Sequence, residues 1–475
     1  MLNTSSIFNE EMKSNVRQRL EPQISVQGID AQGENVSLSW TPSKIKSLTF
    51  TRNIDPTGNS LPSMELKWTE VYDGKLNAQA QPLKYENILA QMTVDLTWTL
   101  DSKDSYTWAE LNELTWYDIA QDGRTWADLL SIKEIVRFPR LFLTSQPKIK
   151  NNLITWTAVD MLSFFNQKWV KYFNGAEYLT SIKNVVLYGL VEARATFWNN
   201  IDLRNLIQTS ILNIKNSEWD SEIGLPILCD GILKEQLVHA CAIDDAFLDF
   251  EKDGSLKISR LTEREKVFDF SANIMPSFPQ ITQLGDIYQY SWTQKVFEPN
   301  EEKKYGKFAT STSDILGIGV DRYNFDGYGW AEDDDYSEIN YTFTLAKTEG
   351  SKIITVIPIM ENEYTFSLTS NNVQNGDAVE EENPLFPYSD SYAHPTWRFN
   401  YLKSLSNSNL SILEFSTIGN IAVETGDRVG VETNLFDEHD NRILKEGFVF
   451  DIKIEYNGVV KEKIKVNEFE GWLDG

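Results

Sequence analysis

Histidine and cysteine are both scarce in this chain of 475 residues, which has three of the former and two of the latter. The histidines (His239, His394 and His439) are far apart in the sequence, which disfavours a histidine-rich metal site or a Ser/His/Asp triad. Cys229 and Cys241 lack C-x-x-C spacing, so we expect buried or idle thiols and no disulfide framework.

Long apolar runs and basic residues are also in short supply. No window of about 18 uncharged apolar residues exists, so no membrane span is expected. The first residues have no basic segment followed by an apolar core, so we expect no secretory signal. The 44 basic residues face 70 acidic ones, and the resulting net charge of −26 favours solubility and disfavours nucleic-acid binding.

Sequence motifs of catalysis are missing as well. The chain contains no G-x-S-x-G, no G-x-x-x-x-G-K-[ST] and no H-E-x-x-H. The acidic runs "EDDD" (332–335) and "EEE" (380–382) lack the spacing of an EF-hand loop, so solvated acidic loops are favoured over calcium ligands. Glycosidase-like carboxylate pairs give no signal, because 70 acids guarantee some close pair. We expect no metal, no cofactor and no enzymatic activity.

Aromatic residues are plentiful, with 14 Trp, 19 Tyr and 25 Phe, and a short motif repeats among them. T-W-x-x-(L/I) occurs three times within 106–130, each time with an acid three places after the threonine. That spacing predicts capping boxes, with tryptophan at N1 and the aliphatic residue at N4 of very short helices. An exposed sugar-stacking platform is the alternative. The residues are Thr107, Trp108, Glu110, Thr115, Trp116, Asp118, Thr125, Trp126 and Asp128.

Periodicity elsewhere predicts mostly strands. Alternating apolar residues indicate a hairpin over 45–74 and a strand over 91–100, and further strands flank a turn at Asn151–Asn152. A helix is expected to open at Thr157, and helical spacing continues over 161–216 and 232–243. Tight hairpin turns are expected at Asp253-Gly254 and at Asn457-Gly458, since both contain glycine.

These patterns predict an α+β, β-dominant fold with several barrel-like β domains, a helical insertion and a helix-plus-hairpin module. Six segments are expected: an N-terminal arm or leading strand (1–40), a first β-barrel-like domain with the capped Trp turns (41–160), a helical insertion (161–225), a helix-hairpin module (226–300), a β domain with long acidic and aromatic loops (301–400), and a C-terminal β-barrel-like domain (401–475).

Taken together, several stretches resemble the tail hub, or tail-associated, proteins of bacterial viruses, a family related to the baseplate hub of contractile-tailed phages and injection systems. They are the 232–260 helix and hairpin, "LITWTAVDML" at 153–162, the Trp motif array, and "ETGDRVGVET…GFVFDIKIEYNGVVKEKIKV" near the C-terminus. The resemblance implies a homotrimer whose two barrel-like domains per chain form a six-fold-like ring around a channel for the tape measure protein and then DNA.

The resemblance also implies partners and a location. These are the tail tube or distal tail protein, the tape measure protein, and fibre or receptor-binding proteins, in a virion tail made in the host bacterial cytoplasm. DNA would be passing cargo, which an acidic lining would let slide. Because the sequence stops at Gly475 after the barrel pattern, we expect no built-in wall-degrading activity.

Two alternatives stay open. One is a carbohydrate-binding or glycan-degrading tail or receptor protein. The other is a distal tail knob that opens the host membrane, with the loop at 314–330 as a channel plug or lipid contact. The residues of that plug hypothesis are Tyr323, Phe325, Tyr328, Trp330, Asp333, Asp334 and Asp335.

Overall fold

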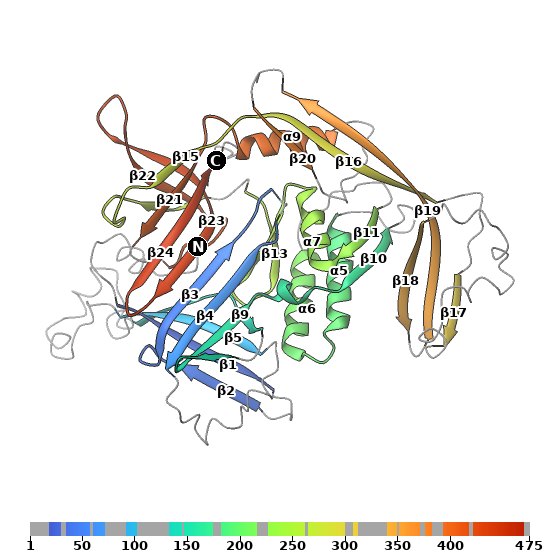
Figure 1. Cartoon of the computed structure of the whole chain (residues 1–475), viewed down its shortest axis with the longest axis horizontal. Helices are drawn as coiled ribbons and strands as arrows, with labels where there is room; N and C mark the ends of the chain where they lie inside the picture. Colours follow the sequence, from blue (N-terminus) through green and yellow to red (C-terminus); the bar gives the residue numbers. More distant parts are fainter. Residues whose placement is uncertain are drawn as a thin grey trace, which may run out of the picture.

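The structure is a computed structural model of the chain (Figure 1). It describes residues 19–29, 35–57, 60–71, 92–101, 133–144, 147–173, 182–215, 227–261, 265–299, 307–311, 340–348, 351–370, 376–381, 393–417 and 421–469. The Trp motif array and the 314–330 loop, with every residue named for them above, lie outside these ranges. No helix in the described ranges is long and apolar enough to cross a membrane.

Most described strands join one fifteen-stranded sheet, so the β-dominant α+β class predicted from periodicity is confirmed. Its main path runs β15-β21-β24-β23-β3-β4-β9-β7-β5-β1-β2. The first half contains β1 (Arg19–Ile29), β2 (Asn35–Trp40), β3 (Ile45–Asn53), β4 (Ser63–Val71), β5 (Thr93–Asp101), β6 (Lys133–Arg137), β7 (Leu141–Leu143), β8 (Lys148–Lys150) and β9 (Leu153–Val159). The second contains β14 (Lys266–Phe270), β15 (Gln280–Gln283), β21 (Ser411–Thr417), β22 (Arg428–Phe436), β23 (Arg442–Tyr456) and β24 (Val460–Glu468).

One antiparallel ladder joins the two halves. β3 pairs with β23 from Leu48 opposite Tyr456 to Asn53 opposite Asp451, so strands about 400 positions apart in the sequence lie side by side (Figure 1). Alternate residues of both strands point into the core, including the buried Phe50 and Ile454. Strands from 41–160 and strands from 401–475 are therefore parts of one continuous sheet.

A helical unit packs beside this sheet (Figure 1). It contains β10 (Lys168–Phe173) paired with β11 (Ile227–Ile232), the helices α5 (Ile182–Thr196), α6 (Ile201–Lys215) and α7 (Leu233–Ala242), and the hairpin of β12 (Phe247–Phe250) and β13 (Leu256–Ser259). The buried Ser210 hydroxyl of α6 accepts a hydrogen bond from the Leu256 amide at 2.7 Å, which fixes the hairpin against the helix.

A second sheet extends away from the first as a long ribbon (Figure 1). Within the described ranges it has five strands: β16 (Ile287–Pro299), β17 (Lys307–Ser311), β18 (Asn340–Thr348), β19 (Ser351–Thr369) and β20 (Asp377–Glu381). β16 and β19 pair along eleven residues. β17 and β18 both pair with the N-terminal part of β19, which begins at Ser351. Helix α9 (Ala393–Leu405) packs near β16 and β20.

Several expectations about local structure are wrong. Thr157 does not open a helix, because it lies in β9; a 3-10 turn η2 (Met161–Phe164) follows, and Asp160 caps it by accepting from the Ser163 amide at 3.1 Å. The stretch 168–173 is strand β10 and not helix, since a short apolar run carries no distinctive period. Helix α9 was not predicted, because a buried arginine interrupts its apolar side.

Candidate functional site

The first functional feature is a sheet sector with two open edges. It runs β15-β21-β24-β23-β3-β4-β9, with β8 beside β9, and so crosses both halves of the sheet. Within the described ranges, β15 pairs only with β21 and β8 pairs only with β9. Each of these outer strands therefore presents one row of backbone donors and acceptors that can pair with another strand.

The backbone geometry of β15 shows which amides face outward. The Leu284 amide donates to the Leu410 carbonyl at 3.0 Å, toward β21. Amides alternate in direction along an antiparallel edge strand, so that of Gln283 points away from the sheet. At the opposite edge, β8 and β9 meet at Asn151 and Asn152, whose φ angles of 52° and 59° are those of the predicted tight turn.

The exposed face of the same sector has mixed charge. Its core side is mostly apolar, with Arg52 and Glu462 buried among the apolar residues, while the other side carries lysines and carboxylates. Three ion pairs lie there: Lys67–Glu65 at 2.7 Å, Lys453–Glu455 at 2.5 Å and Lys465–Asp451 at 3.3 Å. Lys461 and Lys463 of β24 are also exposed on this side. These residues are five lysines against three carboxylates, so the face is slightly basic in a chain whose net charge is −26.

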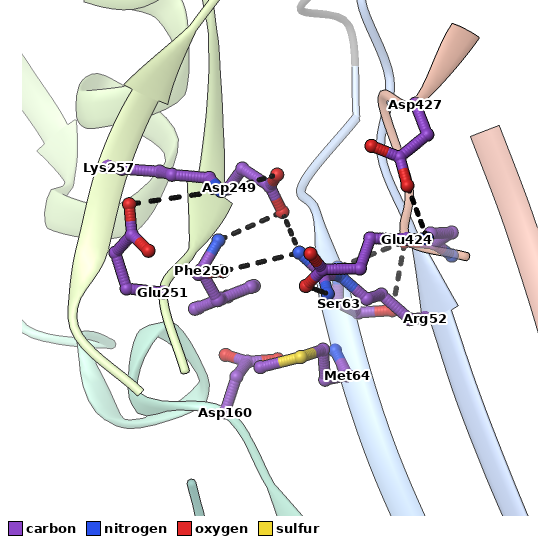
Figure 2. A network of polar contacts seen from close by, with 11 residues as sticks. Arg52, Ser63, Met64, Asp160, Asp249, Phe250, Glu251, Lys257, Glu424 and Asp427 are labelled. Atoms are coloured by element: carbon purple, nitrogen blue, oxygen red, sulfur yellow. Dashed lines mark hydrogen bonds and ion pairs between the residues drawn. The ribbon is translucent and has the colours of Figure 1, made fainter. Parts of the chain in front are cut away.

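The second feature is a buried arginine that ties three parts of the chain together (Figure 2). Arg52 of β3 donates to Asp249 of β12 at 2.6 Å and to Glu424, in the segment before β22, at 3.0 Å. It also donates to the Phe250 carbonyl at 3.2 Å. Lys257 of β13 approaches the second Asp249 oxygen at 3.6 Å. We call this set the Arg52 junction.

Electrostatics keep the Arg52 junction ionised. Burial alone would lower the pKa of the Arg52 guanidinium, but the Asp249 and Glu424 carboxylates outweigh it and raise that pKa above its ordinary value. Burial would likewise raise the pKa of Asp249, and Arg52 together with Lys257 holds it below the ordinary value instead. Each member of the Arg52–Asp249 pair thus stabilises the charged form of the other.

A second buried arginine, Arg398 of α9, also pairs with carboxylates from two other parts of the chain. It donates to Glu381 of β20 at 3.0 Å, to Asp245 after α7 at 3.3 Å, and to the Thr57 carbonyl in the β3–β4 connection. Tyr401 donates to the neighbouring Pro56 carbonyl at 3.3 Å. The Arg398 junction therefore connects the ribbon sheet, the helical unit and the first half of the main sheet.

The Arg398 junction corrects one interpretation from the sequence. Glu381 belongs to the run expected to be a solvated acidic loop, yet it is 5% exposed and lies in β20. Burial raises the pKa of Asp245 to about 6, although Arg398 acts in the opposite direction. Glu381 therefore pairs with a buried guanidinium instead of lying in a solvated loop.

Both arginine junctions are charge pairs between separate parts of the chain. Their carboxylates bind guanidinium or ammonium groups, and in the described ranges no group of three or more His, Cys, Asp or Glu residues is arranged to hold a metal ion. Cys229 and Cys241 are free and buried, as expected, and burial raises the pKa of both thiols. Burial also lowers the pKa of His239, which is half-buried.

The turn residues chosen from the sequence lie where the hairpins need them. Asp253 accepts from the Ser255 amide at 2.8 Å, and Gly254 has a φ of +86° in the β12–β13 turn. Gly458 has a φ of +97° in the β23–β24 turn. Arg52 was not predicted as a functional residue, although its place in the alternation after Leu48 and Phe50 puts a charge at a core position.

No family model and no curated protein matches the chain. Among solved structures, it is similar to the 43 kDa tail protein of prophage MuSo2 from Shewanella oneidensis (TM-score 0.43, 9% identity, covering 94% of this chain and 98% of that one). It is also similar to a tail protein from Neisseria meningitidis (TM-score 0.45, 7% identity, covering 95% and 99%).

A third similar structure is a component of the type VI secretion system of E. coli, described as structurally similar to T4 bacteriophage tail proteins (TM-score 0.35, 6% identity, covering 90% of this chain and 75% of that one). These proteins are of the kind that the sequence motifs resemble.

Proposed function

We propose that this chain is a structural hub protein at the distal end of a virus tail. Copies of it form a ring that adapts the tail tube to tip or fibre proteins and conducts DNA. The observation that supports this most is the sheet sector that spans both halves and ends in the open edges of β15 and β8.

Edge pairing gives a direct route to a ring. β15 of one copy and β8 of the next are different surfaces, so their contact is head-to-tail and closes into a ring when the rotation per copy permits. The open edges would then be satisfied instead of being left to aggregate. The three copies implied by the sequence resemblance would each contribute two barrel-like halves, and the Arg52 junction would hold each pair of halves at a fixed angle.

The lining proposed for the channel differs from the acidic one expected from net charge. If the exposed face of the sector faces inward, three lysine–carboxylate pairs line the bore together with Lys461 and Lys463. Lysines paired with carboxylates attract DNA phosphates less than an unpaired basic lining does, so DNA would pass without strong binding. The carboxylates that pair with three of the five lysines would thus keep the affinity for DNA low.

Carbohydrate binding has weaker support from this chain. Most described tryptophans are core residues, with Trp68 and Trp98 fully buried. Trp198 and Trp397 are exposed, at 69% and 61%, but they belong to separate units, the α5–α6 connection and α9. The tail tube, tape measure and fibre proteins stay the proposed partners, the virion tail the proposed location, and a non-enzymatic role the proposed chemistry.

A backbone substitution at the β15 edge tests the ring. Gln283→Pro removes an amide that points outward, a position where an edge strand tolerates proline, and should leave the fold intact while blocking the next strand. Gln283→Ala is the matched control, because it removes the same side chain and keeps the amide. Native mass spectrometry should show a trimer for the intact chain and Gln283→Ala, and monomer for Gln283→Pro. A monomeric intact chain, alone and with its tail partners, would refute the proposal.

A further inference from the structure

The connection between β22 and β23 is an exposed hairpin. All nine residues from 434 to 442 are exposed, and Figure 1 shows the hairpin extending beyond the rest of the sheet. Apolar side chains are among the exposed ones: Phe436 is 58% exposed and Leu444 is 41% exposed. Large exposed apolar groups gathered on a projecting element mark a contact surface.

The hairpin is held in one shape before any partner arrives. The Asp437 carboxylate accepts from the amides of His439 and Asn441, both at 2.8 Å, and the Asp437 amide donates to the Asn441 carbonyl at 2.9 Å. At the base, Arg442 donates to Glu432 at 2.9 Å, and Glu432 accepts from the Ala272 amide at 2.7 Å. Such pre-ordering lowers the entropy lost on binding.

The exposed apolar groups share one side of the hairpin. Phe436 lies directly opposite Arg442, and residues directly opposite in an antiparallel pair point to the same side. Leu444 is two positions beyond Arg442 on the same strand, so it also points there. The Arg442 guanidinium lies over the Phe278 ring at 4.9 Å. Phe278, Phe436, Arg442 and Leu444 thus make one continuous surface, which we call the hairpin face.

The composition of the hairpin face is that of a protein-binding surface. Phenylalanine and arginine are enriched at the centres of protein interfaces, and here an arginine is already fixed by stacking and by Glu432. Beside the face, the tip carries three exposed carboxylates, Asp437, Glu438 and Asp440. A complementary partner needs an apolar groove with lysine or arginine at the end that meets the tip.

The direction of the hairpin shows that its partner is not the neighbouring copy in the ring. β23 stops pairing with β3 at Asp451 and continues nine residues further to Arg442, so the tip lies past an end of the shared strands. The open edges β15 and β8 lie along the sides of the sector. We propose that the hairpin face docks into a basic-rimmed apolar groove on a different tail protein stacked coaxially on the ring. This inference rests on the proposed hub function, and three hairpins per ring would bind together with added avidity.

Site-specific photocrosslinking tests the hairpin face. The full chain is co-expressed with each tail tube and distal tail protein encoded beside it, with p-benzoylphenylalanine in place of Phe436 or, as control, of Val459. Val459 is 52% exposed in the turn at the opposite end of β23. Crosslinks to one of those proteins should be at least about tenfold more abundant from position 436 than from position 459.

Reversing one charge at the hairpin tip is the second part of this experiment. Glu438→Lys, at an exposed site in the turn, should reduce the position-436 crosslink by about tenfold. Equal crosslinking from positions 436 and 459, crosslinks only between copies of this chain, or no effect of Glu438→Lys would each overturn the inference. Native mass spectrometry of the same samples reports the ring separately. A trimer without the crosslink refutes only the hairpin face, whereas a monomer refutes the hub proposal.

Discussion

Arg52 and Asp249 form a 2.6 Å ion pair between strands β3 and β12 in which the two side chains are only 3% and 1% exposed. A charged pair so far from water is stable only while both members and their hydrogen bonds are present. The Arg52 junction therefore holds the main sheet and the helical unit together. Neither Arg52 nor Asp249 is stable in its buried, charged state without the other.

Removing the arginine should destabilise the chain strongly. Arg52→Met leaves Asp249 and Glu424 without their guanidinium, and we expect a loss of about 3–5 kcal/mol in the free energy of unfolding, seen as a lower Tm in calorimetry. The exposed Lys67–Glu65 pair is the control, since Lys67→Ala should cost less than about 1 kcal/mol. Equal effects of the two substitutions would show that the Arg52 junction does not hold the units together.

Asp160 should make stability depend on pH. Its carboxylate is buried and accepts from the Met64 amide at 2.8 Å and the Ser163 amide at 3.1 Å. Burial raises its pKa from 3.8 to about 6, although those hydrogen bonds act in the opposite direction. The folded state thus binds the proton more tightly than the unfolded one. The stability contributed by the protonated form is fully present below about pH 3.8 and is lost as pH rises through about 6.

Asp160→Asn isolates this contribution, because asparagine does not titrate. The difference in unfolding free energy between the intact chain and the variant should shift by about 2 kcal/mol between pH 4 and pH 7, with the intact chain relatively less stable at pH 7. Thermal unfolding of both proteins at several pH values measures it. Parallel pH profiles would mean that Asp160 does not titrate differently on folding.

Two glycines with positive φ should respond differently to the same substitution. At Gly458 a Cβ would meet nothing within 4 Å, so Gly458→Ala carries only the left-handed backbone penalty of about 1–2 kcal/mol. At Gly254 a Cβ would lie 2.6 Å from the Arg140 carbonyl oxygen, which adds about 1–3 kcal/mol of steric strain. Chemical denaturation of the two variants should therefore show the larger loss for Gly254→Ala, and the reverse order would contradict this turn geometry.

Local patterns predicted much of the secondary structure. Alternation predicted the hairpin of β3 and β4, and Asn-Gly and Asp-Gly pairs predicted turns that the structure contains at residues 457–458 and 253–254. Each of these strands and turns is determined by residues that are close together in the sequence. Helix α7 followed in the same way from its apolar spacing.

Long-range features could not be predicted in this way. The pairing of β3 with β23 depends on complementarity between segments about 400 positions apart, to which no periodicity refers. The Arg52 and Arg398 junctions need partners from several units, and one sequence gives no means of choosing among 70 acids. The Arg52 and Arg398 junctions were therefore not predicted from the sequence. The alternation of β3 nevertheless shows that Arg52 occupies a core position.

The last prediction concerns Glu70, whose two carboxylate oxygens accept from two indoles. Trp40 donates at 2.8 Å and Trp156 at 2.9 Å, and the two rings meet edge to face at 5.1 Å. In Glu70→Gln, the single amide oxygen satisfies one indole while the amide NH2 opposes the other. We expect a loss of about 1–3 kcal/mol, because one nearly buried donor is left without an acceptor.

Trp156→Phe should relieve that conflict, since it keeps an aromatic ring and removes the competing N–H. The double variant should consequently be more stable than the sum of the two single effects by at least about 0.5 kcal/mol. Trp98→Phe is the control, because the buried Trp98 Nε1 has no hydrogen-bond acceptor among the described residues and its ring contacts Phe138 and Tyr456 instead of the Glu70 indoles. Its effect should simply add to that of Glu70→Gln. Additivity in both cycles, measured by denaturant unfolding, would show that Glu70 does not fix the indoles.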